Sequence, residues 1–179
     1  MQKAEPWQKA EISGPIKALP ITKPEIMAAM IGRARRPVVL IGNKALENDG
    51  FGIEFTIRLA KSIKIATVAT AHTLSEFKKK GFQPTSWMSF MDIANRLSDP
   101  EWKGLDGMGN YDLVLFLGFD YYLQWTVLSS LKHFANHLKT VSIDSFYQPH
   151  ANWSLVNFKI DEWKKFLSEV LSRLEKGKA

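Results

Sequence analysis

The sequence contains no cysteine among its 179 residues. This absence excludes disulfide bonds and a cysteine nucleophile. It also excludes thiolate ligation of zinc or of an iron–sulfur cluster by this chain. Any such cluster that the function requires must therefore be held by a partner.

Long hydrophobic runs are absent as well. No apolar run approaches the roughly 18 residues that span a bilayer. The first residues, MQKAEPWQKAEISGP, contain no apolar stretch followed by a small-residue cleavage site. We therefore expect a cytoplasmic protein with no membrane partner.

The composition predicts one folded domain with a real core, because 45% of the residues are hydrophobic and 23% are charged. The formal net charge is +6, which raises the question of nucleic-acid binding. The cations are scattered, with local groups only at Arg33, Arg35 and Arg36 and at 78–80. Neither group is interleaved with aromatic residues, so we expect no nucleic-acid partner.

Several catalytic and ligand-binding motifs are missing. GNKALENDGFG follows an apolar run but matches neither GxGxxG nor a Walker loop, and no GxSxG occurs. His133 and His137 have helical i, i+4 spacing without the glutamate of a zinc protease motif. We therefore predict no catalytic residue and no metal ligand in this chain.

Apolar runs of strand type alternate with helix-like periodicity along the chain. The predicted strands are 37–42 (PVVLIG), 64–70 (KIATVAT), a short piece near 84–86, 112–118 (DLVLFLG), 139–144 (KTVSID) and 155–160 (LVNFKI). The predicted helices are 24–34, 51–62, 73–80, 88–97, 124–136 and a long one from 161.

This alternation predicts an α/β protein with a three-layer α/β/α Rossmann-like fold and a mainly parallel sheet of about six strands. Residues 21–179 are expected to form this single domain. Residues 1–20 contain three prolines and little periodicity, so we expect an N-terminal arm that is extended or disordered.

In such sheets ligands bind beyond the carboxyl ends of the strands, where the strand order reverses. If strands 37–42 and 112–118 flank that point, Gly42 and Gly118 face each other. Together with Asn43 and Asp144 they would form a flavin or nucleotide crevice. The alternative interpretation of Gly42 is a simple turn at the end of a strand.

Aromatic residues are concentrated in the second half of the chain, and too many fall in loops and helix starts to be all core. They are Trp87, Phe90, Trp102, Phe119, Tyr121, Tyr122, Trp125, Phe146, Tyr147, Trp153 and Trp163. Exposed members of this set would indicate a partner surface, because aromatic residues are enriched at interface centres.

The segment DPEWKGLDGMGNYDLVLFLGF, residues 99–119, places a glycine-rich loop before a strongly apolar strand. The glycines provide tight turns at low conformational cost. We expect the loop to be ordered by packing, with Trp102 as its anchor.

With this segment, and with TKPEIMAAMIGRARRPVVLIG near the start, the sequence is similar to the epsilon subunits of archaeal acetyl-CoA decarbonylase/synthase complexes. These are the small subunits of the carbon monoxide dehydrogenase component. The resemblance covers roughly residues 20–175. It rests on these two segments and on the order of the elements between and after them.

The resemblance implies a Rossmann-like domain of the DHS-like NAD/FAD-binding type. It also implies association with the alpha subunit, which carries the nickel and iron–sulfur clusters, in an alpha2epsilon2 assembly. The expected role is that of a non-catalytic accessory subunit that binds and stabilises this partner. The alternative is a FAD-binding subunit that assists electron transfer. A homo-oligomer is a further expectation for the isolated chain.

Overall fold

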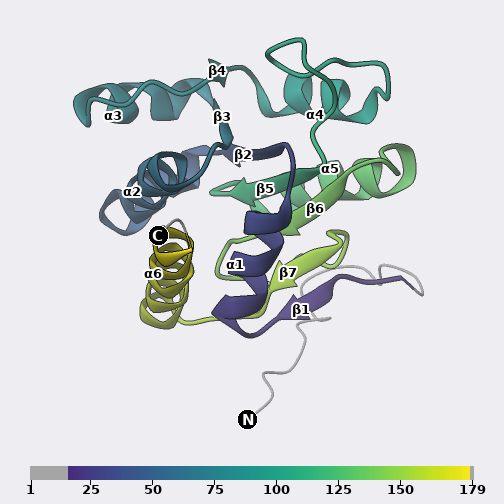
Figure 1. Cartoon of the computed structure of the whole chain (residues 1–179). Helices are drawn as coiled ribbons and strands as arrows, with labels where there is room; N and C mark the ends of the chain where they lie inside the picture. Colours follow the sequence, from purple (N-terminus) through teal and green to yellow (C-terminus); the bar gives the residue numbers. More distant parts are fainter. Residues whose placement is uncertain (1–15, 178–179) are drawn as a thin grey trace.

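Residues 16–177 are described in a computed structural model of the chain, in which one sheet of seven strands is covered by helices on both faces (Figure 1). The strands are β1 (Leu19–Ile21), β2 (Pro37–Ile41), β3 (Ala66–Ala69), β4 (Ser86–Trp87), β5 (Leu113–Leu117), β6 (Lys139–Ser142) and β7 (Trp153–Leu155). The α-helices are α1 (Pro24–Arg33), α2 (Glu47–Ser62), α3 (Leu74–Lys79), α4 (Phe90–Ser98), α5 (Tyr121–Phe134) and α6 (Ile160–Lys176).

The strand order is β1-β7-β6-β5-β2-β3-β4, and all neighbouring strands pair in parallel. From β4 to β7 this is the 3-2-1-4-5-6 order of the doubly wound fold. The chain moves outward in one direction through β3 and β4 and in the other through β6 and β7. The order therefore reverses between β2 and β5. The predicted α/β class with a mainly parallel sheet is confirmed.

The central strands are buried on both faces, and their side chains alternate between two cores. Val39 of β2 and Leu115 of β5 belong to the core under α1, α2 and α6. Val38 and Val114 belong to the core under α4 and α5. This two-sided burial explains why PVVLI of β2 and LVLFL of β5 are apolar at every position.

Helix α6 covers one face of the sheet with the apolar stripe that its spacing predicts. The buried members of this stripe are Trp163, Phe166, Leu167, Val170, Leu171 and Leu174. The indole N–H of Trp163 donates a 2.8 Å hydrogen bond to the carbonyl of Ile143, just after β6. The start of the helix is thereby fixed to the sheet.

Strand β1 is the element that the sequence interpretation did not include. It pairs with β7 at the edge of the sheet, with Leu19 opposite Trp153, so the boundary predicted between residues 20 and 21 falls within this strand. Three residues that include Pro20 are too short to give a strand pattern, and proline is tolerated at a sheet edge. Residues 1–15 of the predicted arm lie outside the described residues.

The last predicted strand, 155–160, is shifted. Strand β7 ends at Leu155, and the next residues pack against the loop after β6 instead. The Asn157 side chain accepts a 3.1 Å bond from the backbone N–H of Tyr147, and the N–H of Phe158 donates to Ser145 at 2.8 Å. These bonds replace the ladder that a longer strand would require.

The starts of two helices compare differently with the prediction, because α5 begins earlier and the regular part of α2 begins close to the predicted residue. Helix α5 begins at Tyr121, where the N–H of Gln124 already donates to the carbonyl of Asp120. Helix α2 is assigned from Glu47, but Asn48, Asp49 and Gly50 have positive φ angles of 54°, 64° and 72°. Regular α-helix therefore follows only after Gly50, close to the predicted start at residue 51.

Candidate functional site at the switch point of the sheet

The loops that follow β2 and β5 are joined backbone to backbone. The N–H of Gly42 donates to the carbonyl of Leu117 at 2.9 Å, and the N–H of Lys44 donates to the carbonyl of Gly118 at 2.8 Å. A Cβ atom on Gly42 would lie 2.3 Å from the carbonyl oxygen of Gly118. The two glycines are therefore in direct contact.

Asp144 joins this cluster from the end of β6. Its Oδ1 accepts a 2.7 Å hydrogen bond from the N–H of Gly118, and the side chain is buried. Burial raises the pKa of Asp144 to about 7, although the Gly118 N–H, the Gln124 amide and the Lys44 ammonium all favour the ionised form. The second carboxyl oxygen, Oδ2, has no hydrogen-bond partner among the described residues.

Gln124 of α5 completes the buried polar cluster, and sequence reasoning missed it. Its Nε2 donates to the hydroxyl of Ser142 at 2.9 Å, while its Oε1 has no partner within residues 16–177. Within the described part of the chain, Asp144 Oδ2 and Gln124 Oε1 thus have no hydrogen-bond donor, which is unusual in a folded interior. The sequence feature that could have indicated its burial is helical spacing, because Gln124 lies on the same face of the helix as the buried Val127, Leu128 and Leu131.

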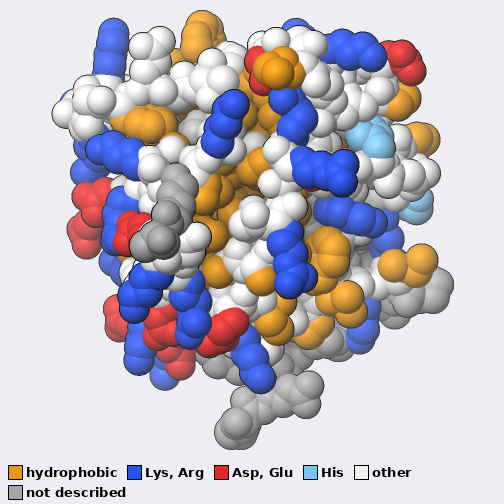
Figure 2. Space-filling model, in the orientation of Figure 1, with side chains coloured by type: hydrophobic (Ala, Val, Ile, Leu, Met, Phe, Trp, Pro, Cys, Tyr) orange, Lys and Arg blue, Asp and Glu red, His pale blue; other side chains and the backbone are white. Residues whose placement is uncertain are grey.

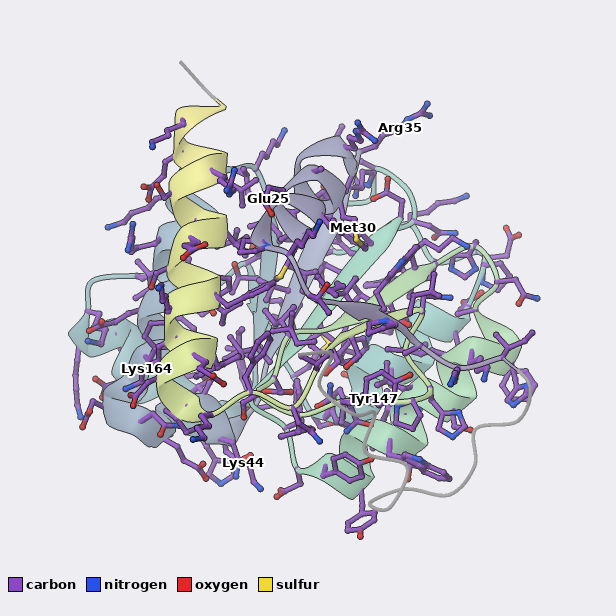
Figure 3. The ribbon with its side chains drawn as sticks, turned by 90° about the horizontal axis from the view of Figure 1, so that it is seen from below. Glu25, Met30, Arg35, Lys44, Tyr147 and Lys164 are labelled. Carbon is purple, nitrogen blue, oxygen red and sulfur yellow. The ribbon has the colours of Figure 1, made fainter. Side chains whose placement is uncertain are left out.

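Above the glycines lies an exposed polar rim. Asn43 is exposed, and the ammonium of Lys44 forms a 2.9 Å ion pair with Asp120. This hydrogen bond to Asp120 is the main cause of the raised pKa of Lys44. Figure 3 shows Lys44 and Tyr147 toward one end of the molecule, opposite Arg35. Lys44 and Asp120 were not among the residues predicted for the crevice.

The structure thus gathers the four residues predicted for a flavin or nucleotide crevice, Gly42, Asn43, Gly118 and Asp144. The two glycines are in direct contact, so the space between the two loops is filled at this point. A ligand at this end would lie outside the glycines, against Asn43 and Lys44. There, an anionic group would compete with Asp120 for the Lys44 ammonium.

The predicted aromatic surface divides into core, half-buried and exposed members. Phe90, Phe119, Tyr147 and Trp163 are buried. Trp87 and Tyr122 are the exposed members of the set, at 64% and 73% exposure. They lie on different elements, β4 and α5. Trp153, which is half-buried at the start of β7, belongs to a different surface described below.

Among the histidines, His150 is buried and its ring packs edge-on against Trp125, with ring centroids 4.6 Å apart. Burial lowers the pKa of His150 to about 4, with further contributions from Lys132 and His133. It is therefore neutral at pH 7. Within residues 16–177 no group of three or more histidine, aspartate or glutamate side chains is placed to hold a metal ion.

The glycine-rich loop before β5 is packed onto the domain, in agreement with the prediction for Trp102. The Trp102 ring lies 5.7 Å from that of Tyr111 and packs against the core under α4 and α5. Arg36 forms a 2.6 Å ion pair with Asp106, and the hydroxyl of Tyr111 accepts a bond from the N–H of Leu105.

Within residues 16–177, no helix has the length and apolarity needed to cross a bilayer.

Strand order and site together define a doubly wound α/β domain in which two glycines are in direct contact at the switch point. The chain belongs to the family described as CO dehydrogenase beta subunit/acetyl-CoA synthase epsilon subunit, whose model matches residues 1–171.

Individual relatives agree with this family. An acetyl-CoA decarbonylase/synthase complex subunit epsilon of Methanothermobacter thermautotrophicus is 37% identical, over 92% of this chain and 93% of the relative. Subunit epsilon 1 of Archaeoglobus fulgidus is 42% identical, over 85% and 83% of the two chains. The subunit epsilon of Methanothrix soehngenii is 34% identical, over 96% and 91%. The resemblance inferred from the sequence is confirmed.

Proposed function

We propose that this chain is a non-catalytic accessory subunit of the carbon monoxide dehydrogenase component of an acetyl-CoA decarbonylase/synthase complex. In this role it binds and stabilises the metal-bearing alpha subunit in an alpha2epsilon2 assembly. The observation that carries the proposal is the family match along residues 1–171, with relatives named as epsilon subunits of that complex. Because the chain contains no cysteine, it offers no thiolate to an iron–sulfur cluster. Its contribution is then made through contact with the partner.

The proposal is tested by anaerobic co-purification of the full-length chain with the alpha subunit of the same organism. We expect co-elution at equal stoichiometry and a higher melting temperature of the alpha subunit in the presence of this chain, because a ligand that binds only the folded state stabilises it. The isolated chain, run alone on the same column, also reports its own oligomeric state. Separate elution together with an unchanged melting temperature would contradict the proposal.

The second candidate function is binding of FAD at the switch point, in support of electron transfer. Two observations favour it: the loops lie where doubly wound sheets bind nucleotides, and Asn43 and Lys44 form a polar rim there. When bound, the flavin would supply the redox chemistry. Asn43 and Lys44 would contact it from the rim.

Titration of the isolated chain with FAD, followed by flavin fluorescence, tests this candidate. Binding tighter than about 10 µM, equivalent to about 7 kcal/mol, would support it. Lys44→Ala removes the rim cation and is expected to weaken such binding, whereas Lys165→Ala on α6 serves as the control. An unchanged fluorescence at saturating chain would exclude a flavin site carried by this subunit alone.

A further inference from the structure

The amino ends of the strands, opposite the switch point, carry adjoining surface hollows. One hollow of about 200 Å³ lies at the starts of β5, β6 and β7 beside the end of α1. At Ala34 it adjoins a second hollow of about 530 Å³ between α1 and α6, which Arg35 also lines. We use the name amino-end groove for the surface formed by Met30, Arg33, Arg35, Leu113, Lys139 and Trp153.

Strand register and helix position together build this groove. Leu113 and Lys139 are direct neighbours at the starts of β5 and β6, and Trp153 begins β7. The C-terminal end of α1 supplies Met30 and Arg33. In Figure 3, Arg35 lies at the end of the molecule away from Lys44, and Met30 lies between the two, nearer to Arg35. The groove is therefore separate from the candidate flavin site.

The groove carries positive charge that no ion pair within residues 16–177 neutralises. Arg33, Arg35 and Lys139 are exposed, and none of them takes part in an ion pair among the described residues. Asp112 is the one carboxylate among the described residues that line the smaller hollow, and it accepts bonds of 2.7 and 2.9 Å from the backbone N–H groups of Arg35 and Arg36. Asp112 therefore fixes the backbone between α1 and β2 and leaves the guanidinium of Arg35 available.

The floor of the groove is apolar. Leu113 is buried, and Met30 and Trp153 are half-buried. Methionine, tryptophan and arginine are the residue types enriched in protein–protein interfaces, where an apolar centre is surrounded by a polar rim. On the face shown in Figure 2, hydrophobic side chains in the middle are surrounded by Lys and Arg, and most acidic side chains lie to the left.

This arrangement favours a protein partner over a nucleic acid. Binding of a duplex depends mainly on cations placed against successive phosphates, and the apolar floor between Arg33 and Lys139 would contribute nothing to it. A protein segment with carboxylates around an apolar side chain would match both the floor and the rim.

We propose that the amino-end groove is the surface through which this chain binds an acidic segment of its partner protein. This inference rests on the proposed function, which identifies that partner as the alpha subunit. Carboxylates of the segment pair with Arg33, Arg35 and Lys139, and an apolar side chain packs between Met30 and Trp153. Complementary charge of this kind acts mainly on the association rate and on specificity.

The test uses the full-length chain with Arg35→Glu and Lys139→Glu together. Affinity for the isolated alpha subunit is measured at about 50 and 300 mM salt. We expect at least a tenfold loss of affinity at low salt and a weaker salt dependence than that of the wild type. The matched control, Lys78→Glu with Lys165→Glu, changes the net charge equally at exposed positions on α3 and α6. This control is expected to remain within twofold of the wild type.

The conservative pair Arg35→Lys and Lys139→Arg retains the charges and is expected to retain affinity within about threefold, and thermal unfolding of each variant checks its fold. If the wild type binds the alpha subunit and the charge-reversed chain binds equally well, the groove proposal is overturned and the proposed function stands. If the wild type itself does not bind, both fail. Preferential binding of the wild type to a DNA or RNA duplex would also overturn the proposal that the groove binds a protein.

Discussion

At the scale of single residues, Gly42 and Gly118 allow the loops after β2 and β5 to come into direct contact at the switch point of the sheet. Gly118 has a φ of 78°, and a Cβ atom there would lie 2.4 Å from the backbone nitrogen of Ala45. A side chain at this position would therefore meet backbone atoms, which cannot rotate away. Glycine is needed here for close approach of the two loops as well as for its backbone angle.

Gly118→Ala is expected to lower the free energy of unfolding by about 3 kcal/mol, because it combines a left-handed backbone with a clash against Ala45. Gly107→Ala is the matched control, since Gly107 has a similar φ of 73° with nothing within 4 Å of its would-be Cβ. The control should cost only about 1 kcal/mol. Urea unfolding of both variants measures the difference, and equal losses would show that the clash is relieved.

The buried groups Asp144 and His150 act on stability in opposite directions as the pH changes. The raised pKa of Asp144, about 7, favours the protonated folded state. Its contribution to the free energy of unfolding is complete below the pKa of aspartate in the unfolded chain, near 4. This contribution is lost as the pH rises to about 7. The lowered pKa of His150, about 4, favours the neutral folded state. That contribution is complete above about 6.5 and is lost as the pH falls to about 4.

We therefore predict that replacing either group leaves the pH dependence of stability that is due to the other, between about pH 4 and 6.5. Asp144→Asn should make stability rise with pH relative to the wild type, and His150→Phe, which retains a ring beside Trp125, should make it fall. The slope of the free energy of unfolding that each group can cause is at most about 1.4 kcal/mol per pH unit. Chemical unfolding at several pH values measures these slopes. Parallel profiles of wild type and Asp144→Asn would show that Asp144 titrates normally.

At the scale of elements, the loop before β5 is held by side-chain packing more than by regular structure. Gly104, Gly107 and Gly109 all have positive φ angles, of 75°, 73° and 118°. The loop is attached to the domain through Trp102 against Tyr111 and through the ion pair between Arg36 and Asp106. The same segment supplies Asp112 at the amino-end groove, so its packing bears on the proposed interface.

Trp102→Ala is expected to cost about 1–3 kcal/mol, less than the truncation of a fully buried aromatic residue because Trp102 is only half-buried. Trp87→Ala on β4 removes the same side chain from a site that is 64% exposed and should change stability by less than about 0.5 kcal/mol. Thermal and urea unfolding compare the two variants. A loss of stability for Trp87→Ala as large as that for Trp102→Ala would contradict this assignment of the anchor.

The elements that the sequence predicts well are those with a strong pattern. Strands β2 and β5 are apolar throughout, and α6 has a regular stripe, so their position follows from burial alone. Strand β1 was missed because its place depends on pairing with β7, which lies more than a hundred residues away in the sequence. At the candidate site, glycines after strands indicated Gly42 and Gly118. The pairing of Lys44 with Asp120 and the burial of Gln124 arise only when α5 packs on the sheet.

At the scale of the whole molecule, two helical layers share one sheet whose central strands contribute to both cores. The prediction of a single domain over residues 21–179 therefore has a direct test. Far-UV circular dichroism and tryptophan fluorescence should report one coincident unfolding transition, because neither layer can lose its packing without exposing β2 and β5. Leu167→Ala in α6 should shift both signals equally, and separate midpoints would indicate two independent units.

The polarity of the parallel sheet also affects how an assembly could be organised around this subunit. The amino-end groove and the loops that contain Gly42 and Gly118 lie at opposite ends of the same strands. A protein bound at one end would therefore leave the other end uncovered. The proposed protein partner and a small-molecule ligand would therefore contact two different faces of the subunit. Occupancy of one face by a subunit and of the other by a small molecule would then be compatible events, with additive binding energies.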